Sequence, residues 1–366
     1  MSSCGFDTYP EGGRMRGLCH DTRPTRTFMS ASPASSAQPL PGAGHLRQRL
    51  MDRVRPIVIG VAGDSGSGKT TYTGGIEWLL GESLVSQISL DGYHREDRAT
   101  RRRTGSSPLD PDQNRLDEAA SHLRQLINGD PALVPVYDHA TGCFAEPRWH
   151  QPTPVILVEG LHTLYPLMRD LLDFAIYVDT DATIRRDWKT TRDTRGRGYR
   201  SEDVEAEIQR RATQYDEWIA GQQDTADVIL RIHPSRLESL ALGEMNPDEG
   251  GSCHHLEVIV HPQADNQPAL YFPVDLNNMN RESAVPFMLA TVPSRFRGRA
   301  VNVLHVDGQM PSAALATLEQ EICAFAGVEA PSGDACASAD PQPTIRFAQM
   351  LVAWPILAQV AALESA

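Results

Sequence analysis

The sequence has no long apolar run and a shortage of positive charge. No hydrophobic stretch in its 366 residues approaches the roughly 20 residues that a membrane-spanning helix needs. Lys and Arg number 34 against 47 Asp and Glu, which gives a formal net charge of −13 at pH 7. A broad nucleic-acid-binding surface needs an excess of positive charge. We therefore expect a cytoplasmic protein with neither a membrane nor a nucleic acid as its partner.

The sequence also lacks a closely spaced cysteine pair. Its six cysteines lie at positions 4, 19, 143, 253, 323 and 336, and no two of them form C-x-x-C. This spacing argues against a zinc site or a dense disulfide framework. We expect reduced, mostly structural thiols.

A phosphate-binding loop is the strongest feature that is present. Residues 63–70 read GDSGSGKT, which fits the pattern G-x-x-x-x-G-K-[ST] between an expected strand and an expected helix. In that context, backbone N–H groups and the helix N-terminus converge on phosphate oxygens. Lys69 would reach the β- and γ-phosphates of ATP, and the Thr70 hydroxyl would be a Mg²⁺ ligand. The residues expected to bind the ATP phosphates are Gly63, Asp64, Ser65, Gly66, Ser67, Gly68, Lys69, Thr70 and Thr71.

Composition divides the chain into three segments. Residues 1–52 are rich in Ser, Pro, Gly and Ala, and we expect a disordered N-terminal extension. A transit peptide, or a start assigned too far upstream with Met51 as the true first residue, are the alternatives. Residues 56–234 alternate apolar runs with helical segments, which predicts an α/β P-loop kinase core with a parallel sheet and crossover helices. Residues 253–366 predict a smaller C-terminal α+β region.

Each segment has its expected elements. The expected strands are 57–61, 85–90, 155–158, 174–178, 228–232, 256–261, 269–274 and 301–306. The expected helices are 69–80, 113–127, 182–191, 201–219, 311–326 and 345–363.

Two carboxylates follow expected strands. Glu159 ends the run VILVE, where a P-loop enzyme holds Mg²⁺ or its water shell. Asp91 follows the strand at 85–90, and a carboxylate there can orient an attacking hydroxyl and take its proton. A turn or helix-capping role fits the spacing of Asp91 equally well.

Two cationic clusters follow these carboxylates along the chain. The first contains Arg98 and the run 101–103, and the second contains Lys189, Arg192, Arg195, Arg197 and Arg200. Gly196 and Gly198 should break the helix at the second cluster and make it a mobile lid over phosphates. The alternative is a solvated, charged helix end.

Together these segments resemble phosphoribulokinases of the phosphoribulokinase/uridine kinase family. The resemblance rests on Asp91-x-x-His94, on Arg98 seven residues after Asp91, and on the pattern K-x-x-R-D-x-x-x-R-G from Lys189 to Gly198. It also includes PLDPDQNRLD (108–117), PVYDHATG (135–142), VEGLH (158–162) and VNVLHVDGQ (301–309), the last of which resembles the longer, plant- and cyanobacteria-like branch.

The resemblance implies transfer of the γ-phosphate of ATP to the carbon-1 hydroxyl of ribulose 5-phosphate, and it suggests a homodimer. Asp91 would be the catalytic base, and Lys69 and Lys189 would assist the transfer. Glu159 and Thr70 would hold Mg²⁺. The residues that would bind the sugar phosphate or line its site are His94, Arg98, Tyr137, Arg192, Asp193 and Arg197.

The sequence departs from the resemblance at three places. Gly92 stands where the longer branch has a second Asp, and Ser67 stands where light-regulated plant enzymes have a redox cysteine. The C-terminal cysteine pair of photosynthetic relatives is not evident around Cys253. We therefore expect no disulfide switch in the loop.

Two other functions remain open. One is a uridine- or pantothenate-kinase-like enzyme, whose acceptor would not need the second Arg cluster. The other is a non-catalytic nucleotide-binding regulator, although such a protein would not need Lys69, Asp91 and Glu159 together.

Overall fold

We describe the chain from a computed structural model. It describes residues 46–81, 83–197, 210–237, 254–260, 287–308, 310, 312–326 and 343–362. The expected strand at 269–274 and most of the expected N-terminal extension lie outside these residues.

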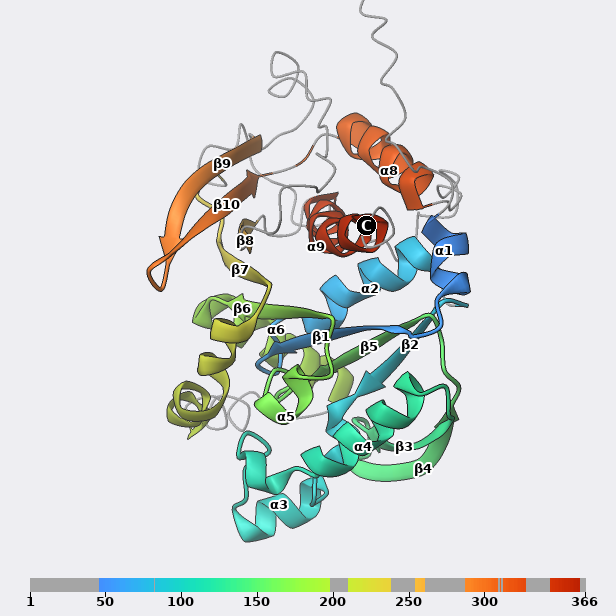
Figure 1. Ribbon diagram of the computed structural model, residues 1–366. Helices are drawn as coiled ribbons and strands as arrows, with labels where there is room; N and C mark the ends of the chain where they lie inside the picture. The colour runs from blue at the N-terminus through green and yellow to red at the C-terminus, as the bar shows by residue number, and fades with distance from the viewer. Residues whose placement is uncertain are drawn as a thin grey trace, which may run out of the picture. The chain divides into compact units, whose positions relative to one another are not determined.

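In the described part of the chain, eight strands form one sheet in the order β2-β5-β1-β6-β7-β8-β10-β9 (Figure 1). Its strands are β1 (Ile57–Gly63), β2 (Val85–Ser89), β5 (Val155–Gly160), β6 (Phe174–Thr180), β7 (Val228–Pro234), β8 (His254–Val260), β9 (Phe287–Phe296) and β10 (Arg299–Gly308). The pairs from β2 to β7 are parallel, and those from β7 to β9 are antiparallel. The predicted α/β class is therefore confirmed.

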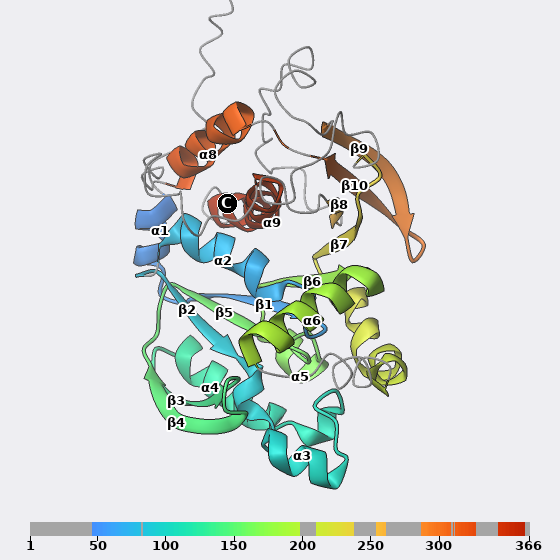
Figure 2. The ribbon, with the colours of Figure 1, turned by 180° about the vertical axis from the view of Figure 1, so that it is seen from behind.

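Helices cover both faces of the sheet (Figure 1; Figure 2). One face packs against α1 (Leu46–Asp52), α2 (Lys69–Leu80), α8 (Ser312–Ala326) and α9 (Pro343–Ala362). The other packs against α4 (Leu116–Ile127), α5 (Pro166–Arg169) and the hairpin of β3 (Ala132–Asp138) and β4 (Cys143–His150). Every residue of β1 is buried, as expected for a parallel strand covered on both sides.

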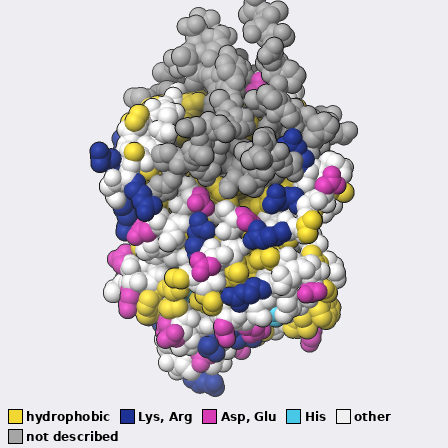
Figure 3. Space-filling view, in the orientation of Figure 1, with side chains coloured by type: hydrophobic (Ala, Val, Ile, Leu, Met, Phe, Trp, Pro, Cys, Tyr) yellow, Lys and Arg dark blue, Asp and Glu magenta, His cyan; other side chains and the backbone are white. Residues whose placement is uncertain are grey.

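The remaining elements connect these strands and helices. They are η1 (Leu90–Tyr93), α3 (Arg98–Thr104), η2 (Pro111–Gln113), α6 (Ala182–Arg197), η3 (Tyr215–Ile219) and η4 (Ala220–Thr225). On the face shown in Figure 3, cationic and anionic side chains of the described residues are interspersed.

Two sequence expectations about helices are wrong. Residues 46–52, assigned to the disordered extension, form α1, because Leu50 is buried and Arg47 donates to the Leu80 carbonyl oxygen at 3.0 Å. The helix expected over 182–191 is longer than expected, since α6 continues through Gly196 to Arg197, and Gly198 lies outside the described residues. One glycine costs a helix only about 1 kcal/mol relative to alanine.

No helix in the described residues has both the length and the apolar character needed to cross a bilayer. Among the same residues the two cysteines, exposed Cys143 and buried Cys323, are free thiols. Burial raises the pKa of the Cys323 thiol to about 11.

Candidate functional site

The phosphate-binding loop joins β1 to α2, as its sequence predicts. Gly66 and Gly68 have φ angles of +83° and +87°, a left-handed conformation that glycine adopts without strain. The Lys69 ammonium turns back over the loop and donates to the carbonyl oxygens of Gly63 at 2.9 Å and Asp64 at 2.8 Å. Burial lowers the pKa of Lys69, although nearby carboxylates oppose the shift.

Some residues of the phosphate-binding loop line a cleft, and the others face away from it. Those that line a cleft are Ser65, Gly66, Gly68, Lys69, Thr70 and Thr71. Gly63, Asp64 and Ser67 are not among its lining residues. Ser67 is 1% exposed, and its carbonyl oxygen accepts a hydrogen bond from Thr180 at 2.8 Å. Ser67 therefore stabilises the loop on the side that faces away from the cleft.

Asp64 holds the loop against two arginines that the sequence reading did not assign. Its carboxylate lies 3.4 Å from an Arg211 nitrogen and 3.7 Å from Arg185 Nε. Burial acts to raise the pKa of Asp64, but the cationic neighbours, Arg211 first, outweigh it and lower the pKa. The negative charge thus stays on Asp64 and fixes the loop to these side chains.

The cleft lies at the carboxyl ends of β1, β2 and β5, where open parallel sheets bind their ligands. Its volume is about 1670 Å³. A site for a single small ligand has about 300–1,000 Å³, so this cleft has room for a donor and an acceptor together.

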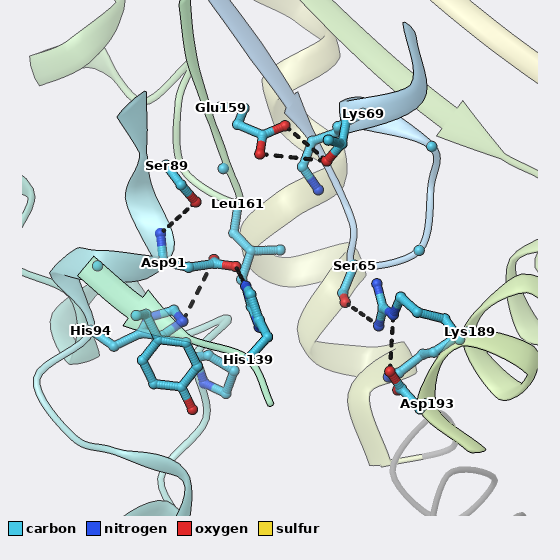
Figure 4. A pocket seen from close by; sticks show the side chains of 18 of the residues that line it. Ser65, Lys69, Ser89, Asp91, His94, His139, Glu159, Leu161, Lys189 and Asp193 are labelled. Carbon is cyan, nitrogen blue, oxygen red and sulfur yellow. Dashed lines mark hydrogen bonds and ion pairs between the residues drawn. The ribbon is translucent and has the colours of Figure 1, made fainter. Parts of the chain in front are cut away.

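Glu159 lies on one side of the cleft (Figure 4), next to Thr70. The Thr70 hydroxyl donates to the Glu159 carboxylate, with oxygen–oxygen distances of 3.1 and 3.4 Å. Burial raises the pKa of Glu159, and the positive charge of Lys69 opposes this. A hydroxyl beside a carboxylate is an oxygen donor set that suits Mg²⁺.

Asp91 lies across the cleft on η1, between two histidines (Figure 4). One carboxylate oxygen is 3.0 Å from His139 Nε2, and the other is 3.6 Å from His94 Nε2. His139 is therefore a site residue that the sequence reading missed, although it lies inside the PVYDHATG segment.

The charge of Asp91 is fixed by these contacts. Burial acts to raise its pKa, but the hydrogen bond from His139 and the positive charges of His139 and Lys69 together lower it below the ordinary value of 3.8. Asp91 is thus an ionised carboxylate facing the loop. The turn-only interpretation of Asp91 does not account for its place between two histidines.

Asn114 sets the tautomer of His94. The Asn114 amide donates to the carbonyl oxygens of Pro108 and Asp110, so its own oxygen faces His94 Nδ1 at 2.7 Å. Nδ1 must therefore carry a proton, and in the neutral ring the lone pair on Nε2 faces Asp91. Burial lowers the pKa of His94, which favours that neutral form. No sequence pattern pointed to Asn114 beyond its place in PLDPDQNRLD.

The β3–β4 hairpin and α3 supply the other residues on the Asp91 side of the cleft. Tyr137 contacts both histidine rings edge-on, with ring centroids 5.7 Å from His94 and 5.2 Å from His139. Arg98 donates to the His139 carbonyl oxygen at 2.6 Å, and Arg101 donates to the Tyr137 hydroxyl at 3.0 Å. Arg98 lines the cleft as predicted and also fixes the turn that carries His139.

The second cationic cluster enters the cleft from α6. Lys189, Arg192 and Asp193 all line it, and Arg192 donates to Asp193 at 2.9 Å and to Ser65 at 3.1 Å. The helix therefore contacts the phosphate-binding loop directly. The side chain of Arg197 lies outside the described residues.

The lysine distribution is an independent sign of function. Lys69 and Lys189 are the only lysines in the sequence, and both line this cleft. Elsewhere the chain uses arginine for its positive charge. The cleft is therefore the one place where the chain has a compact ammonium group, which arginine cannot replace.

The lowered pKa of Asp91 predicts a pH-dependent difference in stability between the wild type and Asp91→Asn. A carboxyl with a depressed folded-state pKa contributes stability above its unfolded pKa and loses it as the pH falls through the folded value. The stability difference between the wild type and Asp91→Asn should therefore be constant near neutral pH, and the wild type should lose stability relative to the variant as the pH falls below the ordinary value of 3.8. Urea unfolding of both proteins across this range measures the difference. A difference that stays constant with pH would contradict the assignment.

Comparison with known proteins matches the chain to kinases. The profile of the Phosphoribulokinase / Uridine kinase family matches residues 58–239. A phosphoribulokinase from Synechocystis sp. is 38% identical over 188 residues, which are 51% of this chain and 56% of the relative. A chloroplastic phosphoribulokinase from Chlamydomonas reinhardtii is 28% identical over 77% of this chain and 81% of the relative.

A uridine kinase from Oceanobacillus iheyensis is 35% identical over 188 residues, which are 49% of this chain and 88% of the relative. The chain spans about half the length of the first curated relatives that it matches.

Proposed function

Because the chain belongs to the phosphoribulokinase/uridine kinase family, we propose that it transfers the γ-phosphate of ATP to the carbon-1 hydroxyl of ribulose 5-phosphate. The observation that carries this proposal is the ionised Asp91, held between His94 and His139 across the cleft from Lys69. A base at that position can serve a hydroxyl acceptor. A protein that only binds nucleotide has no use for it.

In the proposed reaction the acceptor oxygen forms a bond to the γ-phosphorus while the bond to the β–γ bridging oxygen breaks, and ADP leaves. Asp91 orients the attacking hydroxyl and receives its proton. His94 Nε2 lies 3.6 Å from this carboxylate and His139 Nε2 lies 3.0 Å from it. Lys69 and Lys189 supply positive charge to the transferring phosphate.

Thr70 and Glu159 would hold Mg²⁺, and the hydroxyl–carboxylate pair that they form fits an oxygen-preferring cation. When bound, Mg²⁺ neutralises charge on the β- and γ-phosphates.

The arginines favour an acceptor that already carries a phosphate. The hairpin side of the cleft is lined by Arg98, Arg101, Arg102 and Arg148, and Arg210 and Arg211 line it too. ATP phosphates alone do not require this many guanidinium groups, and arginine suits phosphate recognition. Uridine and pantothenate offer no phosphate to such a group.

We also propose a homodimer formed through β9. In the described sheet, β9 is the outermost strand beyond β10, and an edge strand can pair with another chain. The molar mass from light scattering tests this.

A coupled ADP-release assay tests the proposed function. The full chain with Mg-ATP is supplied separately with ribulose 5-phosphate, ribulose, uridine or pantothenate, and without any acceptor. We expect turnover with ribulose 5-phosphate and much less with unphosphorylated ribulose. Turnover confined to uridine would identify a nucleoside kinase, and no turnover with any acceptor would favour a nucleotide-binding regulator.

Arg98→Ala should raise the KM for the phosphosugar by about tenfold or more, because a charged hydrogen bond contributes roughly 1.5–3 kcal/mol. It should also lower kcat, since the His139 carbonyl oxygen loses its donor. The KM for ATP should change little. Arg103→Ala is the matched control, because Arg103 lies on the same helix but does not line the cleft. An unchanged phosphosugar KM in Arg98→Ala would refute its role in acceptor binding.

A further inference from the structure

A cluster of imidazole and carboxylate groups lies on the C-terminal strands, apart from the residues that line the cleft. His255 and Glu257 are on β8, and His305 is on β10. One donor atom from each lies within 4.8 Å of the other two. The proposed kinase reaction uses none of these side chains.

The sheet register brings the three side chains together. Glu257 and His305 are directly opposite each other in the antiparallel β8–β10 pair. His255 is two residues before Glu257, so alternation places it on the same face. This face also carries Ile259 and Val303 and is opposite the one that α8 and α9 cover. Because the ligand spacing follows from strand pairing, the backbone holds these groups near one another without a loop rearrangement.

The distances are close to those of a metal site. His255 Nε2 is 3.0 Å from His305 Nδ1, and that nitrogen is 3.8 Å from a Glu257 oxygen. In a tetrahedral site with bonds of about 2.0–2.1 Å, neighbouring donor atoms are about 3.3 Å apart. Shifts of a few tenths of an ångström in each side chain would therefore admit an ion.

The surroundings of His255 also favour a ligand role. His255 is 3% exposed, and its Nδ1 is buried with no hydrogen-bond partner among the residues that the structure describes. To bind a metal through Nε2, the neutral ring must carry its proton on Nδ1. Asp307, which is fully buried on β10, is the carboxylate whose negative charge acts most strongly on this ring and favours a proton on it.

We propose that His255, Glu257 and His305 form a binding site for a divalent transition metal of the Zn²⁺ class, with a fourth position open to water. Two imidazoles and one carboxylate suit such ions, whereas Mg²⁺ and Ca²⁺ prefer oxygen ligands alone. Glu257 and His305 are 21% and 22% exposed, so an ion can enter from solvent. The cysteine spacing argued against a zinc site, but that reasoning covers only thiolate ligands.

The bound ion would join β8 to β10 and thereby strengthen the outer part of the sheet. His254, the residue before His255, points away from this cluster, lines the nucleotide cleft and contacts the Trp188 ring. The site therefore lies on a strand whose opposite face contributes to the cleft.

Metal binding to the untagged full chain, without nucleotide, tests the proposal. We expect calorimetry to find one high-affinity Zn²⁺ per chain, and Co²⁺ to give the intense visible absorption of a tetrahedral site. His305→Gln and Glu257→Gln should each weaken Zn²⁺ binding by at least about tenfold. Added Zn²⁺ should raise the Tm of the wild type more than that of either variant, since a ligand stabilises the state that it binds.

Two histidine variants are matched controls. His122→Gln removes a histidine that bonds to Tyr93 far from β8, and His139→Gln removes a neighbour of Asp91. Both should bind Zn²⁺ like the wild type. The proposal would be overturned if the wild type bound no stoichiometric Zn²⁺. It would also be overturned if His139→Gln lost Zn²⁺ binding while His305→Gln retained it. The three side chains would then form only a hydrogen-bonded cluster. The Co²⁺ spectrum of the wild type tests the proposal even if a variant does not fold. An octahedral spectrum would contradict the proposed tetrahedral site.

Discussion

Asp91→Asn should lower kcat by about 10²–10⁴-fold, the usual contribution of a positioned general base. Asparagine has nearly the same shape but cannot accept the proton of the acceptor hydroxyl. The loss should appear in kcat, because the carboxylate acts on the chemical step. The affinity for ATP should be almost unchanged, since the phosphate-binding loop and Lys69 are on the other side of the cleft. Steady-state kinetics and calorimetric titration with a non-hydrolysable ATP analogue measure the two quantities.

The control for this variant is Asp112→Asn. Asp112 is on the short helix η2, in the segment before α4, and it does not line the cleft. Its kcat should equal that of the wild type. If Asp91→Asn retained most of its turnover, Asp91 would be a turn residue and the base would have to be sought elsewhere.

Gly92→Asp should lower kcat by about 10²-fold, because a misplacement of about 1 Å at a reacting group lowers the rate by about that factor. This loss is expected even though aspartate is the residue of the longer family branch at this position. A Cβ added at Gly92 would lie 2.1 Å from the Pro135 carbonyl oxygen and 2.8 Å from its carbon. These are backbone atoms of β3 and cannot rotate away. Either η1 or β3 must therefore move, and η1 carries the adjacent Asp91.

Gly92→Ala should show most of the same loss, since the Cβ is sufficient for the clash. Overpacking of this kind costs about 1–3 kcal/mol, so the Tm should also fall. Gly74→Ala is the control, because a Cβ there meets nothing within 4 Å. Full activity in Gly92→Asp would mean that the β3 backbone can move without displacing Asp91, and that the contact with Pro135 does not position Asp91.

Local signals predicted much of the nucleotide half of the site. The loop at 63–70 follows a fully buried strand and begins α2 at Lys69, as the sequence indicates. Glu159 was placed correctly at a strand end because acidic residues are conspicuous after four apolar ones. Such features depend on neighbours in the chain, so a single sequence is enough to find them.

The acceptor half depended on contacts between distant segments, which no local pattern reports. His139 reaches Asp91 only because β3 and β4 pair as a hairpin, and that hairpin was not predicted. Asn114 orients His94 across 20 positions of sequence. The strand β9 was missed for a related reason, because half of its ten residues are exposed and it shows little apolar alternation.

The identity of the reaction product tests the central proposal most directly. The chain is incubated with Mg-ATP and ribulose 5-phosphate, and the mixture is followed by ³¹P NMR. We predict equal amounts of ADP and a sugar bisphosphate with a new phosphomonoester resonance on carbon 1, and much slower formation of both products in Asp91→Asn. The assignment of this cleft as a phosphosugar kinase site would be contradicted if ADP and inorganic phosphate formed while the sugar stayed unchanged. It would also be contradicted if no ATP were consumed.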